Sequence, residues 1–376
     1  MAVVSNREEF FDIGGGTLDD QIRDAHARVR EVAPDVTRIA CALYDERDDL
    51  LKTFINSTVD GVALQGYQYR LSDSPSLSQL AKDRTPRLLT DLPTELDPAS
   101  PHSAYVLDEG YVSSLTVPMV HRHELLGFLF FDSRFHDTFT PPVVRELLLH
   151  ASVLTMALAR ERVAVSSVLS TIQIARDFTE LRDHETGAHL DRMSRYARVI
   201  ARDTAGHFGV NDEVVEHLYR FAPMHDIGKI GIPDHILLKP ATLSLAEWEV
   251  MKSHSQRGLE MVDSILDDLE LVDVPERAML RNIVELHHEK LDGSGYPRGL
   301  RGEEVPMEAR IVAVADIFDA LTSPRPYKQA WSFPEAFAEL RYQVSTGKVD
   351  EACVDALISA TDEIAEIKSS YPESGR

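Results

Sequence analysis

The sequence is poor in cysteine and in cations, and both shortages limit what the protein can do. Only two of its 376 residues are cysteines, Cys41 and Cys353, and they lie far apart in the chain. Because thiols are rarely paired in reducing compartments, we expect two reduced, buried thiols. Lys and Arg number 39 against 62 Asp and Glu, and both halves of the chain are acidic. This balance excludes a general binder of DNA or RNA polymers, and an anionic substrate would need metal ions or a few well-placed cations.

Long apolar runs are missing as well. No stretch of 18 consecutive apolar residues occurs, so no transmembrane helix and no membrane partner is expected. The first ten residues, MAVVSNREEF, lack the basic and apolar regions of a signal peptide. We therefore expect a cytoplasmic protein. Its length and its hydrophobic content of 43% fit two domains, each with a core of its own.

The N-terminal half changes from helical to strand-like patterning. Residues 1–16 end in three glycines and are interpreted as a leader, and residues 17–33 carry apolar residues at helical spacing. Strand-like stretches follow at residues 39–43, 51–55, 87–91, 114–120 and 125–132. Several antiparallel strands with flanking helices predict an α+β domain over residues 17–142.

A segment without glycine or proline comes next and predicts a long connecting helix over residues 143–180. Its apolar residues recur at steps of three and four with a break at Glu161, and they are Val144, Leu147, Ala151, Leu154, Leu158, Val165, Val168 and Ile172. Such a heptad-like seam has two interpretations. The helix could pair with its copy in a homodimer, or it could pack on the protein's own two domains.

Residues 181–368 have helical patterning throughout, with breaks at glycine and proline, which predicts an all-α domain. Histidines and carboxylates recur there at short spacings. Glu185 and His189 are four residues apart and would share one face of a helix. The pair His225-Asp226 is followed by Lys229. Further candidates are His254, the adjacent His287 and His288, and Asp316.

These residue types predict a metal cluster. Imidazole and carboxylate without thiolate favour iron, manganese, zinc or nickel over copper(I) or an iron–sulfur cluster. Asp316 lies in the apolar run 311–321, and a buried carboxylate is costly unless it has a cationic partner. The spacing alone supports a metal centre on an all-α domain and goes no further.

Three motifs carry a family resemblance. The string His225-Asp226-Ile-Gly-Lys229 resembles the HD signature of the HD phosphohydrolase superfamily. Residues 287–297, HHEKLDGSGYP, and residues 310–328, RIVAVADIFDALTSPRPYK, resemble the motifs of its HD-GYP subgroup. The resemblance covers about residues 180–360. It implies an all-α, metal-dependent phosphodiesterase that hydrolyses cyclic di-GMP (c-di-GMP) to the linear dinucleotide pGpG, and in many members further to GMP.

The resemblance also implies a role for each candidate. The metal ligands would be Glu185, His189, His225, Asp226, His254, His287, His288 and Asp316. Glu185 would bind a third ion, so two or three ions are both open, with iron as the leading metal, manganese as the alternative and other divalent transition metals not excluded. Asp226 and Lys229 would be catalytic, Asp226 as a bridging carboxylate and Lys229 at the scissile phosphate. The substrate would also be held by Tyr296, Arg325 and Lys328.

Residues 17–142 resemble a GAF-type sensor domain. The similarity rests on the order of helix and strands and on the strings Ala42-Leu43-Tyr44-Asp45 and 127–133, GFLFFDS. The Asn-Lys-Phe-Asp-Glu string of cyclic-nucleotide-binding members is absent, so a ligand for this domain stays open. Two alternatives to the leading interpretation remain. The chain could hydrolyse another cyclic dinucleotide, or it could bind one as a signal and recruit a protein partner through the Gly-Tyr-Pro loop.

Overall fold

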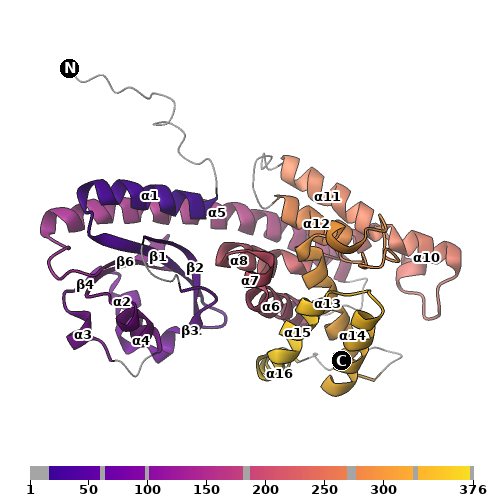
Figure 1. The fold of residues 1–376 in the computed structure, drawn as a ribbon. Coiled ribbons are helices and arrows are strands. Elements are labelled where there is room, and N and C mark those ends of the chain that lie inside the picture. Colours follow the sequence, from indigo (N-terminus) through magenta and orange to yellow (C-terminus); the bar gives the residue numbers. More distant parts are fainter. Residues whose placement is uncertain are drawn as a thin grey trace. The chain divides into compact units, whose positions relative to one another are not determined.

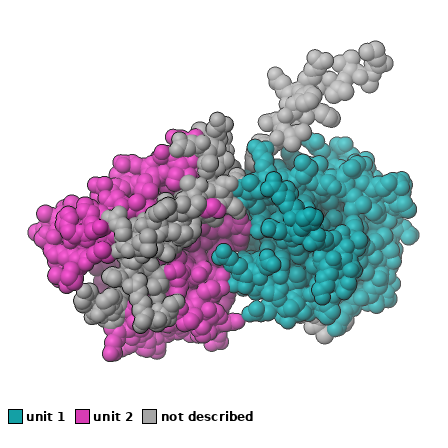
Figure 2. Space-filling model, turned by 180° about the vertical axis from the view of Figure 1, so that it is seen from behind, with its two compact units in different colours: residues 1–163, 211–213 teal, residues 164–210, 214–376 magenta. Residues whose placement is uncertain are grey.

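The chain divides into two compact units (Figures 1 and 2). The computed structural model describes residues 17–59, 64–97, 101–180, 187–268, 277–324 and 329–372. One unit comprises residues 1–163 with 211–213, and the other comprises residues 164–210 with 214–376. The interpreted leader, residues 1–16, lies outside the described residues. The division falls inside the long helix α5 (Pro141–Glu180), whose first part belongs to the first unit.

The first unit is built on an antiparallel sheet of six strands in the order β3-β2-β1-β6-β5-β4. The strands are β1 (Val36–Asp45), β2 (Leu50–Thr58), β3 (Gln68–Arg70), β4 (Arg87–Leu89), β5 (Ser113–His121) and β6 (Glu124–Ser133). Helix α1 (Leu18–Val32) precedes the sheet. The predicted α+β architecture is confirmed. Strand β3 was not predicted, whereas the predicted stretch 87–91 is confirmed as the shorter strand β4.

Alternating residues of the strands supply two different cores. On β6, Leu129 and Phe131 pack with α1 and α5, whereas Phe128 and Phe130 pack on the other face with α2 (Pro75–Asp83). This follows from the two-residue period of a strand. The short elements η1 (Leu71–Asp73), α3 (Leu92–Glu95) and α4 (Pro101–Asp108) complete this unit.

The first half of the heptad-like seam on α5 is an intramolecular packing face. Leu147, Ala151, Leu154 and Leu158 are buried in the core shared with α1 and the sheet. For these positions the interpretation as packing on the protein's own domain holds, and the same side chains are not free to pair with a copy. The seam beyond them, Val165 to Ile172, falls where side chains are not described.

The segment Pro141–Val163 of α5 is long and apolar enough to cross a membrane by length and composition, with a mean hydropathy of 1.4 over the best window. The sequence-based expectation rested on uninterrupted apolar runs, which is a stricter criterion. A core helix meets the length and composition criterion too, and this segment packs one face on the sheet. A single such helix is weak evidence for membrane insertion.

The described residues of the second unit form helices joined by loops, with an isolated β-bridge between Asp292 and Arg301, so the predicted all-α domain is confirmed. Its α-helices are α6 (Gly187–Asp203), α7 (Ala205–Phe208), α8 (Asp212–Phe221), α9 (Asp234–Leu237), α10 (Leu245–Lys252), α11 (His254–Asp268), α12 (Arg277–Leu286), α13 (Met307–Thr322), α14 (Phe333–Ser345), α15 (Glu351–Ser359) and α16 (Thr361–Ser370). Three short 3-10 turns lie between them, η2 (Ala222–Met224), η3 (Ile227–Gly231) and η4 (Gly302–Glu304).

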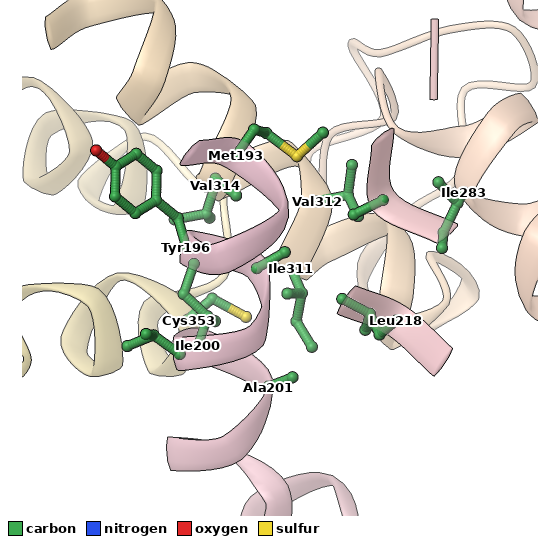
Figure 3. Packing of buried hydrophobic residues seen from close by; sticks show 14 of the residues in the cluster. Met193, Tyr196, Ile200, Ala201, Leu218, Ile283, Ile311, Val312, Val314 and Cys353 are labelled. Atoms are coloured by element: carbon green, nitrogen blue, oxygen red, sulfur yellow. The ribbon is translucent and has the colours of Figure 1, made fainter. Parts of the chain in front are cut away.

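Helix α6 lies in the middle of the second core (Figure 3). Its residues Met193, Tyr196 and Ile200 belong to one buried cluster with Val314 of α13 and Cys353 of α15. Both cysteines of the chain are buried free thiols, as expected from the sequence. Helices α6 and α13 pack against each other, and each carries a candidate metal ligand, His189 on α6 and Asp316 on α13. Their packing therefore brings these two residues together.

Candidate metal centre

The structure brings seven of the eight candidate ligands together in two adjoining groups. One group is formed by Asp226, His254, His287 and His288, and the other by His189, His225 and Asp316. Within each group one ligand atom per residue lies within 4.8 Å of all the others. Atoms that bind one transition-metal ion at about 2.1 Å are at most roughly 4.2 Å apart, so each group needs only a small contraction to hold an ion. The eighth candidate, Glu185, lies outside the described residues.

Two glycines bring the HD motif against α11. A Cβ atom on Gly228 would lie 1.8 Å from the backbone oxygen of His254, and one on Gly258 would lie 2.6 Å from a methyl group of Val284. Only glycine allows η3, α11 and α12 to approach this closely. As a result His254, the first residue of α11, faces Asp226, and the end of α12 delivers His287 to the same place.

Asp226 lies between the two groups and directs one oxygen towards each. Its Oδ1 is 3.2 Å from His254 Nε2 and 3.7 Å from His287 Nε2. Its Oδ2 is 3.1 Å from His225 Nε2 and 2.7 Å from Lys229 Nζ. This is the arrangement that a bridging carboxylate requires. The second group closes around Asp316 Oδ1, which is 3.9 Å from His225 Nε2 and 4.0 Å from His189 Nε2.

Hydrogen bonds at Nδ1 fix the tautomer of four histidines. His225, His254 and His287 lie with Nδ1 2.8 to 3.0 Å from the backbone oxygens of Ala222, Met251 and Ile283 respectively. The Nδ1 of His189 lies 2.7 Å from Asp319 Oδ2. These oxygens only accept, so each Nδ1 must donate, and a neutral imidazole then carries its lone pair on Nε2. All four lone pairs therefore point into the cluster.

This lone-pair arrangement is the test of whether a metal fits. The Nε2 atoms of His254 and His287 lie 3.4 Å apart, although each ring already donates through Nδ1. Two lone pairs that face each other at this distance repel unless a cation lies between or beside them. A divalent metal satisfies both nitrogens and the carboxylate oxygens around them, so the residues fit the group that the donor set implies.

The electrostatics favour neutral imidazoles at His287 and His288 and an ionised carboxylate at Asp226. Burial lowers the pKa of His287 and lowers the pKa of His288 well below its usual value, and neighbouring histidines add to the effect. Burial by itself raises the pKa of Asp226, but the ammonium of Lys229 outweighs it and holds that pKa well below its usual range. Neutral imidazole and ionised carboxylate are the protonation states that bind metal.

The carboxylate of Asp319, which the sequence did not indicate as part of the site, orients the imidazole of His189. Asp319 is fully buried on α13, and besides His189 it accepts two hydrogen bonds from Arg192, from Nε to Oδ1 at 2.6 Å and from Nη2 to Oδ2 at 2.9 Å. Burial raises the pKa of Asp319, but these hydrogen bonds lower it to about 2. The available signal was its position three residues after Asp316 in the same apolar run.

The Gly-Tyr-Pro loop brings Tyr296 next to the cluster. The Tyr296 ring centroid is 4.7 Å from that of His288 and 6.3 Å from that of His254. Gly295 packs closely against the chain itself, since a Cβ there would lie 2.4 Å from the backbone nitrogen of Lys290. Glu289 shapes the following turn by accepting hydrogen bonds from the backbone of residues 298–300.

Two of the predicted substrate contacts, Arg325 and Lys328, lie outside the described residues. Of the predicted catalytic and substrate-binding residues, Asp226, Lys229 and Tyr296 are brought together at the cluster. The arrangement can bind metal ions beside an anionic group, with the ammonium of Lys229 and the ring of Tyr296 next to it.

Comparisons with known proteins agree with the motifs. Residues 173–353 match the family model described as HD domain. The curated protein "Cyclic di-GMP phosphodiesterase response regulator RpfG" of Xanthomonas campestris pv. campestris is 43% identical over 209 residues, which cover 55% of this chain and 50% of that protein. The "3'3'-cGAMP-specific phosphodiesterase 2" of Vibrio cholerae is 36% identical over 194 residues, which cover 52% of this chain and 35% of that protein. The chain thus spans half or less of the length of these relatives.

Among solved structures, the GAF domain/HD domain protein from Geobacter sulfurreducens is similar with a TM-score of 0.33 and 18% identity, covering 39% of this chain and 94% of that one. A similarity of this size carries no argument. The description of the first unit as α+β rests on its own strand order.

Proposed function

We propose that this chain is a metal-dependent phosphodiesterase that hydrolyses c-di-GMP, with pGpG or GMP as the end product. The observation that carries the proposal is the convergence of histidine Nε2 atoms on both oxygens of Asp226, with Lys229 beside them. The HD domain is a fold of metal-dependent hydrolases, and the relative named RpfG is a c-di-GMP phosphodiesterase by its name.

Each of the candidate residues would have a separate role in hydrolysis. When bound, the metal ions neutralise charge on the phosphoryl oxygens and lower the pKa of water to roughly 7. Asp226 would hold the two ligand groups at a fixed separation. Lys229 would place its ammonium at the scissile phosphate, where negative charge develops in the transition state. Tyr296 would line the path of the substrate, together with Arg325 and Lys328 as the motif resemblance implies.

The motif resemblance implies iron as the leading metal and manganese as the alternative, and the ligand types suit both. The described ligands form two groups, which suits two ions, and Glu185 would add a third. Elemental analysis of anaerobically purified protein tests the identity and the number together. A Glu185→Ala variant that keeps the metal content of the parent protein would contradict the third ion.

Turnover by the full chain loaded with Fe(II) or Mn(II) tests the activity. Chromatography should show c-di-GMP converted to pGpG, and it distinguishes pGpG from GMP as the end product. His254→Ala should lower metal content and reduce kcat/KM by about 100-fold or more, because it removes an inner ligand. His235→Ala is the matched control, since this exposed histidine of α9 lies outside both ligand groups. Normal turnover by His254→Ala, or none by the loaded parent with any of these metals, would contradict the proposal.

A second candidate substrate is 3'3'-cGAMP, because one matched relative bears this specificity in its name. Competition between the two cyclic dinucleotides in one reaction separates the candidates by their kcat/KM ratio. A chain that binds either dinucleotide at the metal centre and cleaves neither would instead be a binding module that signals to a partner protein through the Gly-Tyr-Pro loop.

We also propose a cytoplasmic homodimer in which the GAF-like unit regulates the phosphodiesterase. Exposed apolar residues follow α5 on the side away from its core, namely Leu149, Val153, Met156 and Val163. Their spacing of three, four or seven residues suits pairing with the same helix of a second copy. Met156→Glu should then shift light scattering from dimer to monomer. A monomeric parent protein at micromolar concentration would contradict the dimer.

A further inference from the structure

Helix α10 presents an aromatic side chain at the edge of the metal centre that no step above uses. The centroids of the Trp248 and Tyr296 rings lie 6.3 Å apart, and the interplanar angle is 81°. Tyr296 in turn contacts His288 and His254. Trp248 is nevertheless 45% exposed, and it belongs to none of the buried cores of the described residues. The indole thus borders the centre while much of its surface stays open to solvent.

The helix that carries the indole is held in place at both ends. At its start, Ser244 and Glu247 form a reciprocal capping box, and Lys239 pairs with Glu247 at 2.6 Å. At its end, α11 follows directly with the ligand His254. A capped helix joined without a loop to a metal ligand fixes the distance between the indole and the cluster.

A cation accompanies the indole on the same face. Lys252 is one turn after Trp248, and its Nζ lies 5.8 Å from the centre of the Tyr296 ring. Its partner Glu249 is 70% exposed, and an exposed pair of this kind is weak. The edge of the centre therefore offers a flat aromatic surface with a positive charge next to it.

We propose that Trp248 is a base-binding residue that stacks on a nucleobase of the substrate while the attached phosphate lies at the metal centre. The inference rests on the proposed function. A purine has flat apolar faces, and one ribose separates it from the phosphate, so the base reaches beyond Tyr296 once the phosphate is bound. Stacking between a base and an aromatic side chain contributes about 1 to 3 kcal/mol, which is roughly a 5- to 150-fold change in affinity. Lys252 offsets the charge of the second phosphate.

Comparison of two substrates tests this role. The full chain loaded with Mn(II) is assayed with c-di-GMP and with bis(p-nitrophenyl) phosphate, a diester without nucleobases. Trp248→Ala should lower the ratio of kcat/KM for c-di-GMP to that for the small diester by roughly 5- to 150-fold, mainly through KM. Trp248→Phe should restore most of the ratio. Leu245→Ala, an 88% exposed position on the same helix, should leave it unchanged.

The outcomes separate this inference from the proposed function. If the parent protein cleaves neither diester, the proposed function fails. If it cleaves both and Trp248→Ala keeps the parent ratio, the base-stacking role is overturned while the phosphodiesterase stands. An equal loss on both diesters also overturns it, because a damaged centre rather than a lost base contact would explain the result. An exposed indole that serves only a protein partner would give the unchanged ratio.

Fluorescence gives a readout that does not depend on turnover rates. The chain has two tryptophans, so Trp331→Phe leaves Trp248 as the single tryptophan, and its emission is followed with excitation that spares tyrosine. Mixing this variant with c-di-GMP should quench the emission, which recovers as the substrate is consumed, whereas dimethyl phosphate should not quench it. Unquenched emission at a c-di-GMP concentration that saturates turnover would overturn the stacking.

Discussion

Replacement of Asp319 by asparagine should weaken metal binding without touching a ligand. The aspartate accepts on both oxygens, from His189 Nδ1 on one and from Arg192 Nε on the other. Asparagine has the same shape but offers one oxygen and one amino group. In one orientation the amide NH2 group faces the N–H of Arg192 Nε, and in the other it faces the N–H of His189 Nδ1, so two donors meet in either case. If the amino group faces His189, the imidazole must accept at Nδ1 and carry its proton on Nε2, which removes the lone pair from the metal centre.

The expected magnitude follows from these contacts. Loss of a hydrogen bond that orients a metal ligand lowers metal affinity or activity by about 10- to 100-fold. The unsatisfied donor should in addition cost about 1–3 kcal/mol of stability, because Arg192 is 2% exposed and has no access to water. Metal titration followed by elemental analysis measures the first effect, and urea unfolding of the metal-free protein measures the second.

A surface ion pair supplies the control for this prediction. Asp263 pairs with Arg281 at 2.6 Å, and both side chains are partly exposed. Asp263→Asn should change stability by less than about 1 kcal/mol and leave metal affinity unchanged. If Asp319→Asn keeps the parent metal affinity although it is destabilised, Asp319 only holds α6 and α13 together, and the reasoning about the tautomer of His189 is refuted.

Three further perturbations address other parts of the molecule. Asp132→Ala leaves Arg38, which is 3% exposed, without its counter-ion. The free energy of unfolding in urea should therefore fall by about 3–5 kcal/mol. A decrease of less than about 1 kcal/mol would contradict a buried ion pair. Burial lowers the pKa of His26 from its usual 6.5. As the pH falls below 6.5 the unfolded chain therefore takes up a proton at this residue before the folded protein does, and the stability of the fold should decrease. In His26→Gln the midpoint of urea unfolding should depend less on pH between 7.5 and 5.5. Gly228→Ala puts a methyl group 1.8 Å from the backbone oxygen of the candidate ligand His254 and should abolish metal binding in elemental analysis, whereas Gly206→Ala, with open space around it, should keep the metal.

Local patterns predicted the helices and strands that are long enough for their apolar pattern to repeat. Strands β1, β2, β5 and β6 and helix α1 each span several periods of their apolar pattern, and the structure places them where the sequence indicated. The short elements β3, α2, α3 and α4 were not predicted, because segments of three to nine residues hold few periods of an apolar pattern.

The seam on α5 shows a different kind of limit. Leu147, Ala151 and Leu154 have the spacing of a dimer interface, yet they face the sheet of their own unit. Residues at steps of three and four define one face of a helix and say nothing about which surface covers it. Only the tertiary structure distinguishes a partner helix from the protein's own core.

By itself the sequence determined the chemical inventory of this protein. Histidine and carboxylate without thiolate, the HD pair with Lys229, and the Gly-Tyr-Pro string were all readable, because they depend on residue types at short separations. The tertiary structure decided which atoms meet. It turned four imidazoles by hydrogen bonds at Nδ1, set Asp226 between two groups, and brought Asp319 behind a histidine 130 residues away in the chain. It also placed Trp248 beside Tyr296. Such contacts arise from helix packing across long sequence separations, and no local pattern encodes them.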